Sequence, residues 1–227
     1  MAAAQEEVLA TPELLELILV ELPMRDLLVT VPLVSTTWQA TTRTPALQHA
    51  LFFLPNLNLP SSSAPVKNPL LVELFPPFFI DVDYVTAVTI MAMPWARAPA
   101  AFKRKEASWR HMLVTQPPAR TVAVTELRVQ WARISVRHAR WNEPTALRIG
   151  KLYDLAVPFI DRVRSSFRIR WHGAPGDGVG VGSDTNLTLD IRYIESHKQL
   201  SRVDKQFESD ANQAVDIEFG EWGPPPG

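Results

Sequence analysis

The segment TPELLELILVELP (residues 11–23) decides how the N-terminal part of this chain folds. Thr11 suits the N-cap of a helix, Pro12 suits its first position, and Pro23 ends it. Seven of the ten residues before Pro23 are apolar, whereas a helix on the surface of a soluble protein normally carries one apolar stripe. We therefore expect this helix to bury a second face in addition to the one that packs on its neighbours.

Further short helices are predicted after this segment. One covers residues 24–31, another begins at Pro32 and runs to residue 40, and another follows Thr44. Residues 55–69 contain four prolines and three consecutive serines, a composition typical of a linker or an extended loop. The predicted organisation is a disordered tail (1–7), a helical segment (8–54), a linker (55–69), a C-terminal domain (70–222) and a short tail (223–227).

The C-terminal domain has the patterns of both strands and helices. Residues 167–171 and 187–194 alternate between apolar and polar side chains, and the glycine-rich connection between them predicts a hairpin with a long loop. Other predicted strands cover 85–93, 121–131 and 214–222, and predicted helices cover 105–116 and 145–159. The predicted fold class is α+β, with three short N-terminal helices followed by a mixed, mainly antiparallel sheet and a few helices.

Composition narrows the class of protein. The chain has no cysteine, which excludes a disulfide scaffold and a cysteine zinc site. Its opening MAAAQEEV lacks the basic and apolar regions of a signal peptide, and no apolar run approaches the roughly 18–20 residues of a membrane span. We expect a protein of the cytoplasm or nucleus that has no contact with membranes.

Charge is distributed unevenly along the chain. The net charge is −6 over residues 1–96, +11 over 97–172 and −6 over 173–227. Arginines on strands can pair with acidic residues across the sheet, or they can form a pocket for an acidic or phosphorylated peptide. A third possibility is binding of nucleic acid, which the acidic segments on both sides disfavour. The arginines concerned are Arg128, Arg133, Arg137, Arg140, Arg168 and Arg170, and the acidic candidates for pairing are Asp190, Glu195, Asp216 and Glu218.

No catalytic motif stands out. The chain contains neither a GxxxxGK[ST] phosphate loop nor a GxSxG nucleophile elbow. The glycine-rich segment 176–182 is followed by no predicted helix, so we interpret it as a flexible loop and not as a dinucleotide site. Asp81 and Asp83 lack further acidic ligands nearby, which favours a solvated turn over a cation site. We therefore expect no metal, no cofactor and no enzymatic activity.

The N-terminal sequence resembles the F-box motif. The resemblance lies in VLATPELLELILVELPMRDLLVTVPLVSTTWQATTRTPALQ (8–48), with its Pro-led first helix rich in Leu and Ile, then LPMRDLL, then LVSTTW. The segments HALFFLP, NPLLVELFPPFF, ASWRHMLVTQPP and LRIGKLYDLA are similar to segments of a large group of fungal F-box proteins. The chain as a whole therefore resembles that group.

The resemblance implies a substrate receptor of a Skp–cullin–F-box ubiquitin ligase. In that complex the F-box docks on the Skp adaptor, which joins it to a cullin, and the C-terminal domain recruits a protein substrate for ubiquitination. The residues that the resemblance places against the adaptor are Pro12, Leu14, Leu15, Ile18, Leu19, Val34 and Trp38, and those expected to pack the helices together are Leu22, Leu27, Leu28, Val31 and Leu33. The alternative is a nucleic-acid-binding or other scaffold protein that acts through residues 97–172.

Overall fold

The chain divides into two compact units, residues 1–59 and 60–227. The boundary lies within the proline- and serine-rich segment 55–69. The structure is a computed structural model that describes residues 8–56, 58–59, 64–80, 84–98, 100, 104–130, 133–160, 165–172, 185–194 and 217–225. Each unit is described by itself.

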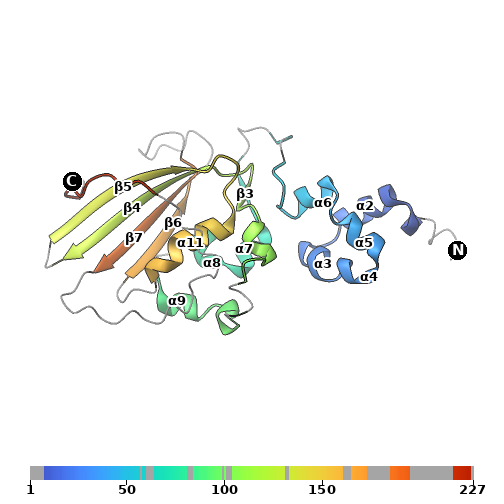
Figure 1. Cartoon of the computed structure of the whole chain (residues 1–227), viewed down its shortest axis with the longest axis horizontal. Helices are drawn as coiled ribbons and strands as arrows, with labels where there is room; N and C mark the ends of the chain where they lie inside the picture. Colours follow the sequence, from blue (N-terminus) through green and yellow to red (C-terminus); the bar gives the residue numbers. More distant parts are fainter. Residues whose placement is uncertain are drawn as a thin grey trace. The chain divides into compact units, whose positions relative to one another are not determined.

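The first unit is a series of short helices (Figure 1). They are α2 (Pro12–Val20), α3 (Met24–Val29), α4 (Val31–Val34), α5 (Thr36–Thr41) and α6 (Pro45–Ala50). The single helix predicted over 32–40 is wrong, because Ser35 is extended and separates α4 from α5. The Ser35 hydroxyl accepts a hydrogen bond from the Trp38 backbone N–H at 3.2 Å, as serine prefers to do at a helix start.

One face of each helix builds the core of this unit. The buried residues are Leu15, Leu19, Leu27, Val31, Leu47 and Leu51, and Leu22, Met24, Leu28, Trp38 and Phe53 pack against them while partly exposed. In α2 the buried pair is spaced by four residues, so it forms one stripe. The core therefore uses a single face of α2 and leaves the rest of its apolar side chains outside.

The second unit contains a five-stranded mixed sheet in the order β2-β6-β7-β4-β5 (Figure 1). The strands are β2 (Val85–Thr86), β4 (Thr121–Gln130), β5 (Arg133–Asn142), β6 (Ser165–Trp171) and β7 (Leu187–Ile194). Strands β4 and β7 are parallel and the other neighbours are antiparallel, including the predicted β6–β7 hairpin. A separate antiparallel pair joins β1 (Val66–Lys67) to β3 (Thr115–Gln116). The α+β class and the mixed sheet are confirmed.

Helices cover one face of this sheet (Figure 1). The helical elements are α7 (Pro69–Leu74), α8 (Pro76–Phe79), α9 (Ala87–Met91), η1 (Pro94–Arg97), η2 (Ser108–His111) and α11 (Ile149–Ile160). Aromatic rings join the layers, with the Phe78 ring 5.2 Å from that of Phe167 on β6 and 6.1 Å from that of Tyr153 on α11. Each such ring buries a large apolar area, so these contacts contribute strongly to the packing of the helices on the sheet.

Two predicted elements are wrong in type. The strand predicted over 85–93 is a strand for two residues only, and α9 follows because Thr86 and Thr89 form a capping box that starts a helix. The helix predicted over 105–116 is one 3₁₀ turn, η2, after which the chain extends to pair as β3. The predicted helix 145–159 exists but begins at Ile149.

The edge of the sheet also differs from prediction. Strand β5 was not expected, because its polar residues fall on both faces and hide the alternation of a half-buried strand. In the predicted strand 214–222, residues 214–216 lie outside the described part and 217–222 form no strand. Instead Gly223 forms an isolated bridge with Val136 on β5, through two backbone hydrogen bonds of 2.9 Å. Asp81, Asp83 and the loop 176–182 lie outside the described residues.

Candidate functional site

An apolar surface lies on the first unit, on side chains that its core does not use. On α2, the exposed fractions are 43% for Leu14, 66% for Leu17 and 41% for Ile18. The spacing of these three places them on a common face of the helix, next to the buried stripe. On α4, Leu33 is 82% exposed and Val34 54%. We call these five residues the helical apolar surface.

The residues proposed for the adaptor divide between this surface and the core. Pro12, Leu14, Ile18 and Val34 are exposed, and Trp38 is partly buried against the core. Leu15 and Leu19 are fully buried inside the unit, which removes them from any surface that a partner can contact. The reason is the helical period, because residues 15 and 19 turn toward the other helices while 14 and 18 turn away.

Two apolar residues lie where the sequence did not predict them. Leu33 was expected to pack the helices together, but in the four-residue α4 the inward residue is Val31, so Leu33 faces outward. Leu17 was not singled out, although its spacing from Leu14 and Ile18 is the signal that would have found it. The expected packing of Leu27 and Val31 is confirmed.

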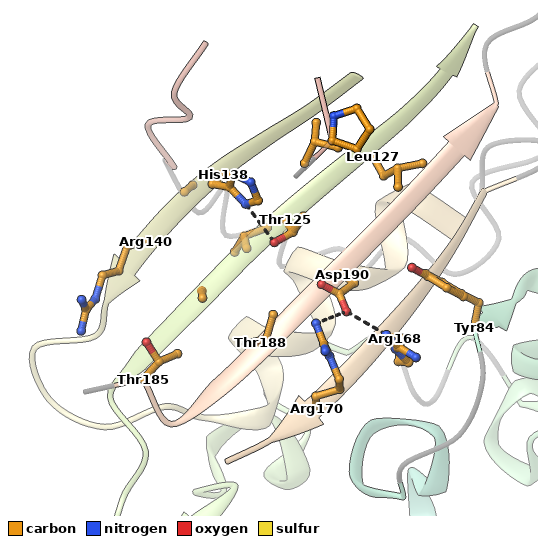
Figure 2. A pocket seen from close by; sticks show the side chains of 15 residues that line it. Tyr84, Thr125, Leu127, His138, Arg140, Arg168, Arg170, Thr185, Thr188 and Asp190 are labelled. Carbon is orange, nitrogen blue, oxygen red and sulfur yellow. Dashed lines mark hydrogen bonds and ion pairs between the residues drawn. The ribbon is translucent and has the colours of Figure 1, made fainter. Parts of the chain in front are cut away.

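The second candidate site is a groove on the face of the sheet opposite the helices (Figure 2). It has a volume of about 820 Å³. Its lining residues come from all four long strands and from Tyr84, Thr185 and Pro225. We call it the basic groove, because Arg140, Arg168 and Arg170 line it together with one carboxylate, Asp190.

Strand register arranges the groove in rows. Arg170 on β6 pairs with Thr188 on β7, Thr188 with Ala123 on β4, and Ala123 with Arg140 on β5. The next row on the same face runs from Arg168 through Asp190 and Thr125 to His138. Figure 2 shows Arg140 at one side of the sheet and Arg168 and Arg170 at the other. Small side chains therefore lie between two basic sides.

The six arginines singled out from the sequence do not form one cluster. Three of them line the basic groove, whereas Arg128, Arg133 and Arg137 lie on the other face of the sheet. Successive residues of a strand point to opposite faces, so Arg137 and Arg140, three residues apart, cannot share one. Arg128 and Arg137 stack on the ring of Trp222, with guanidinium carbons 4.3 and 4.6 Å from its centroid.

Acidic residues pair with some of these arginines. Asp190 Oδ2 lies 2.9 Å from an Arg170 Nη2 and 3.5 Å from an Arg168 Nη2, so two cations share one oxygen. Glu126 accepts a hydrogen bond from Arg137 Nε at 2.5 Å, a partner that only the β4–β5 register reveals. Glu218 is exposed, and no ion pair joins it to a described residue. Glu195 and Asp216 lie outside the described residues.

The donors of the groove are only partly used. The Nε atoms of Arg168 and Arg170 are buried, and neither has a hydrogen-bond partner among the described residues. Arg140 is exposed and forms no ion pair within the part of the chain that the structure describes. The threonine hydroxyls of the groove are already engaged, because Thr188 Oγ1 lies 2.7 Å from His172 Nε2 and Thr125 Oγ1 lies 3.2 Å from His138 Nδ1. Chemically, this face offers hydrogen-bond donors to an anion.

Several other observations bear on function. Among the described residues, no group of three or more His, Cys, Asp or Glu side chains is placed to hold a metal ion. None of the described helices combines the length and apolarity needed to cross a bilayer. Comparison with family models, with curated proteins and with solved structures finds no match for this chain.

Proposed function

We propose that this chain is a non-catalytic substrate receptor of a Skp–cullin–F-box ubiquitin ligase. The first unit, as an F-box, binds the Skp adaptor and through it the cullin, and the second unit recruits a protein substrate. The observation that carries the proposal is the helical apolar surface on a unit whose core is already filled. The resemblance of residues 8–48 to the F-box motif is the reason for proposing the Skp adaptor as the partner.

The distribution of exposed apolar side chains supports a partner for the first unit. Of the 17 large apolar residues exposed among the described residues, 11 belong to residues 1–59, which supply about 30% of the described residues. Leu14, Leu17 and Ile18 form an exposed apolar patch on one face of α2, and such patches mark protein–protein interfaces. Complete burial of one leucine contributes about 1.5–3 kcal/mol, so each exposed apolar residue that a partner covers adds to the binding free energy.

The test is copurification of the full chain with a Skp adaptor. Leu17→Asp and Leu33→Asp each introduce a charge on the helical apolar surface, and because both positions are exposed, the fold of the unit is retained. We expect each change to lower adaptor affinity at least about tenfold, since it removes one apolar anchor and buries a charge. The matched control is Val88→Asp on α9 in the second unit, where the side chain is 76% exposed.

Two results would count against this function. If the unaltered chain captures no adaptor, the assignment of the first unit is wrong. If Val88→Asp lowers affinity as much as Leu17→Asp, the adaptor does not bind the helical apolar surface. Leu15 is unsuitable as a test position, because an aspartate there would unfold the buried core.

A further inference from the structure

We propose that the basic groove binds a phosphorylated side chain within an extended peptide, held between Arg140 on one side and Arg170 on the other. Only the statement that this peptide belongs to a ubiquitination substrate rests on the proposed function. The binding itself follows from the register, the charge and the unused donors of this face.

The geometry provides a trough between two cationic walls. Arg170 and Arg140 occupy the two ends of one register row, and the two residues between them are Thr188 and Ala123. Three strand spacings separate the two ends, about 14 Å between Cα atoms. Figure 2 shows the Arg140 side chain directed away from the sheet and the Arg170 side chain directed toward Asp190. Both side chains are long and flexible, so their guanidinium groups can turn toward one anionic group in the trough.

The charge of the groove matches a phosphate monoester. Three arginines and one aspartate line it, which leaves two positive charges uncompensated among the described residues. A phosphorylated side chain carries about −1.5 to −2 charges at pH 7. Arg168 and Arg170 both use the same Asp190 oxygen, and their Nε atoms lack hydrogen-bond partners, so their planar donor forks are not saturated. Such forks suit phosphate oxygens in a bidentate manner.

The rest of the groove favours a peptide over a nucleic acid. The next register row places Leu127 between Val136 and the exposed Arg192, and Pro225 also lines this end. An apolar side chain of the same peptide can pack there while its phosphate lies between the arginines. A nucleic acid needs a continuous basic track, but Arg128, Arg133 and Arg137 lie on the opposite face.

The experiment uses the full chain and fluorescent nine-residue peptide libraries with phosphothreonine, threonine or glutamate fixed at the centre. We expect fluorescence anisotropy to show at least about tenfold tighter binding of the phosphothreonine library, the effect of one or two charged hydrogen bonds. Arg140→Ala and Arg170→Ala should each weaken that binding about tenfold. Asp190→Asn should tighten it, because it removes the carboxylate that competes with phosphate for two arginines.

The control variant is Arg133→Ala, which removes an exposed arginine from the opposite face and should change binding less than about twofold. Because Arg140 is exposed, its variant keeps the test valid even if Arg170→Ala fails to fold.

Four results would overturn the proposal: equal binding of the three libraries, equal losses from Arg133→Ala and Arg140→Ala, competition by inorganic phosphate at the concentration of the peptide, or tighter binding of single-stranded poly(U) RNA. Adaptor copurification of Arg140→Ala is measured in parallel, so a failure of adaptor binding is distinguished from a failure of the groove.

Discussion

The buried ion pair between Arg110 and Asp154 gives the sharpest prediction about stability. It joins η2 to α11, and the two side chains are only 5% and 2% exposed. Replacing Asp154 with Leu leaves a guanidinium without its carboxylate in the interior, and breaking a buried pair in this way costs about 3–5 kcal/mol. We therefore expect Asp154→Leu to lower the free energy of unfolding of the second unit by that amount.

The double variant separates this effect from a loss of packing. Arg110 Nη1 is buried without a hydrogen-bond partner among the described residues, so the pair is not fully satisfied even when it is intact. Adding Arg110→Met removes the uncompensated charge, and apolar replacements of similar volume are often close to neutral. The double variant should therefore recover most of the loss and be more stable than Asp154→Leu alone.

The assay is urea denaturation of the full chain, followed by circular dichroism and by tryptophan fluorescence. Trp109 belongs to the second unit, and the Arg110 guanidinium carbon lies 5.2 Å from the centroid of its ring. Its fluorescence therefore reports on the surroundings of the ion pair. A loss below about 1 kcal/mol for Asp154→Leu, or additive losses in the double variant, would refute the argument that desolvated charge dominates this site.

Three further predictions concern packing and the capping of a helix. Leu19→Ala should destabilise the first unit by about 2–5 kcal/mol, measured by thermal unfolding, whereas Leu17→Ala, at an exposed site on the same helix, should change stability by less than about 0.5 kcal/mol. Gly150→Ala should lower the free energy of unfolding by about 1–3 kcal/mol, because the added Cβ would lie 2.7 Å from a backbone oxygen. The control Gly220→Ala should be tolerated, because the nearest atom to its added Cβ is 3.6 Å away. Equal urea midpoints for the two variants would contradict this prediction. Asn68→Ala should cost about 1–3 kcal/mol, since the buried Asn68 side chain accepts two backbone N–H bonds at the start of α7, and an unchanged midpoint would show that the cap contributes nothing.

Local patterns in the sequence predicted part of the fold correctly. Prolines at the first turns of α2 and α6 marked where helices begin, since the missing N–H is not needed there. Alternation of apolar and polar residues identified β6, β7 and their hairpin. In β6 burial follows that alternation, whereas in β7 the polar residues Thr188 and Asp190 are buried as well. Where local chemistry competed, the prediction failed, as at Ser35, which caps a helix that was expected to be continuous.

The sequence predicted which kinds of residue form the candidate sites, but not how those residues are arranged. Residue composition indicated an excess of apolar side chains on α2 and a basic segment in the second unit. It did not say which arginines share a face, because that depends on the pairing of β4 with β5 and with β7. Nor did it show that Leu15 is buried while Leu14 is exposed, since that depends on where the neighbouring helices pack.

The sequence by itself therefore determined the α+β class, the starts of α2, α3 and α6, the hairpin of β6 and β7 and the surplus of apolar residues in the segment 11–23. These follow from local backbone preference and from the periods of helices and strands. Only the tertiary structure decided the parallel pairing of β4 with β7, the separation of the arginines onto two faces, and the outward position of Leu33. Those features depend on contacts between residues far apart in the chain, which local patterns do not specify.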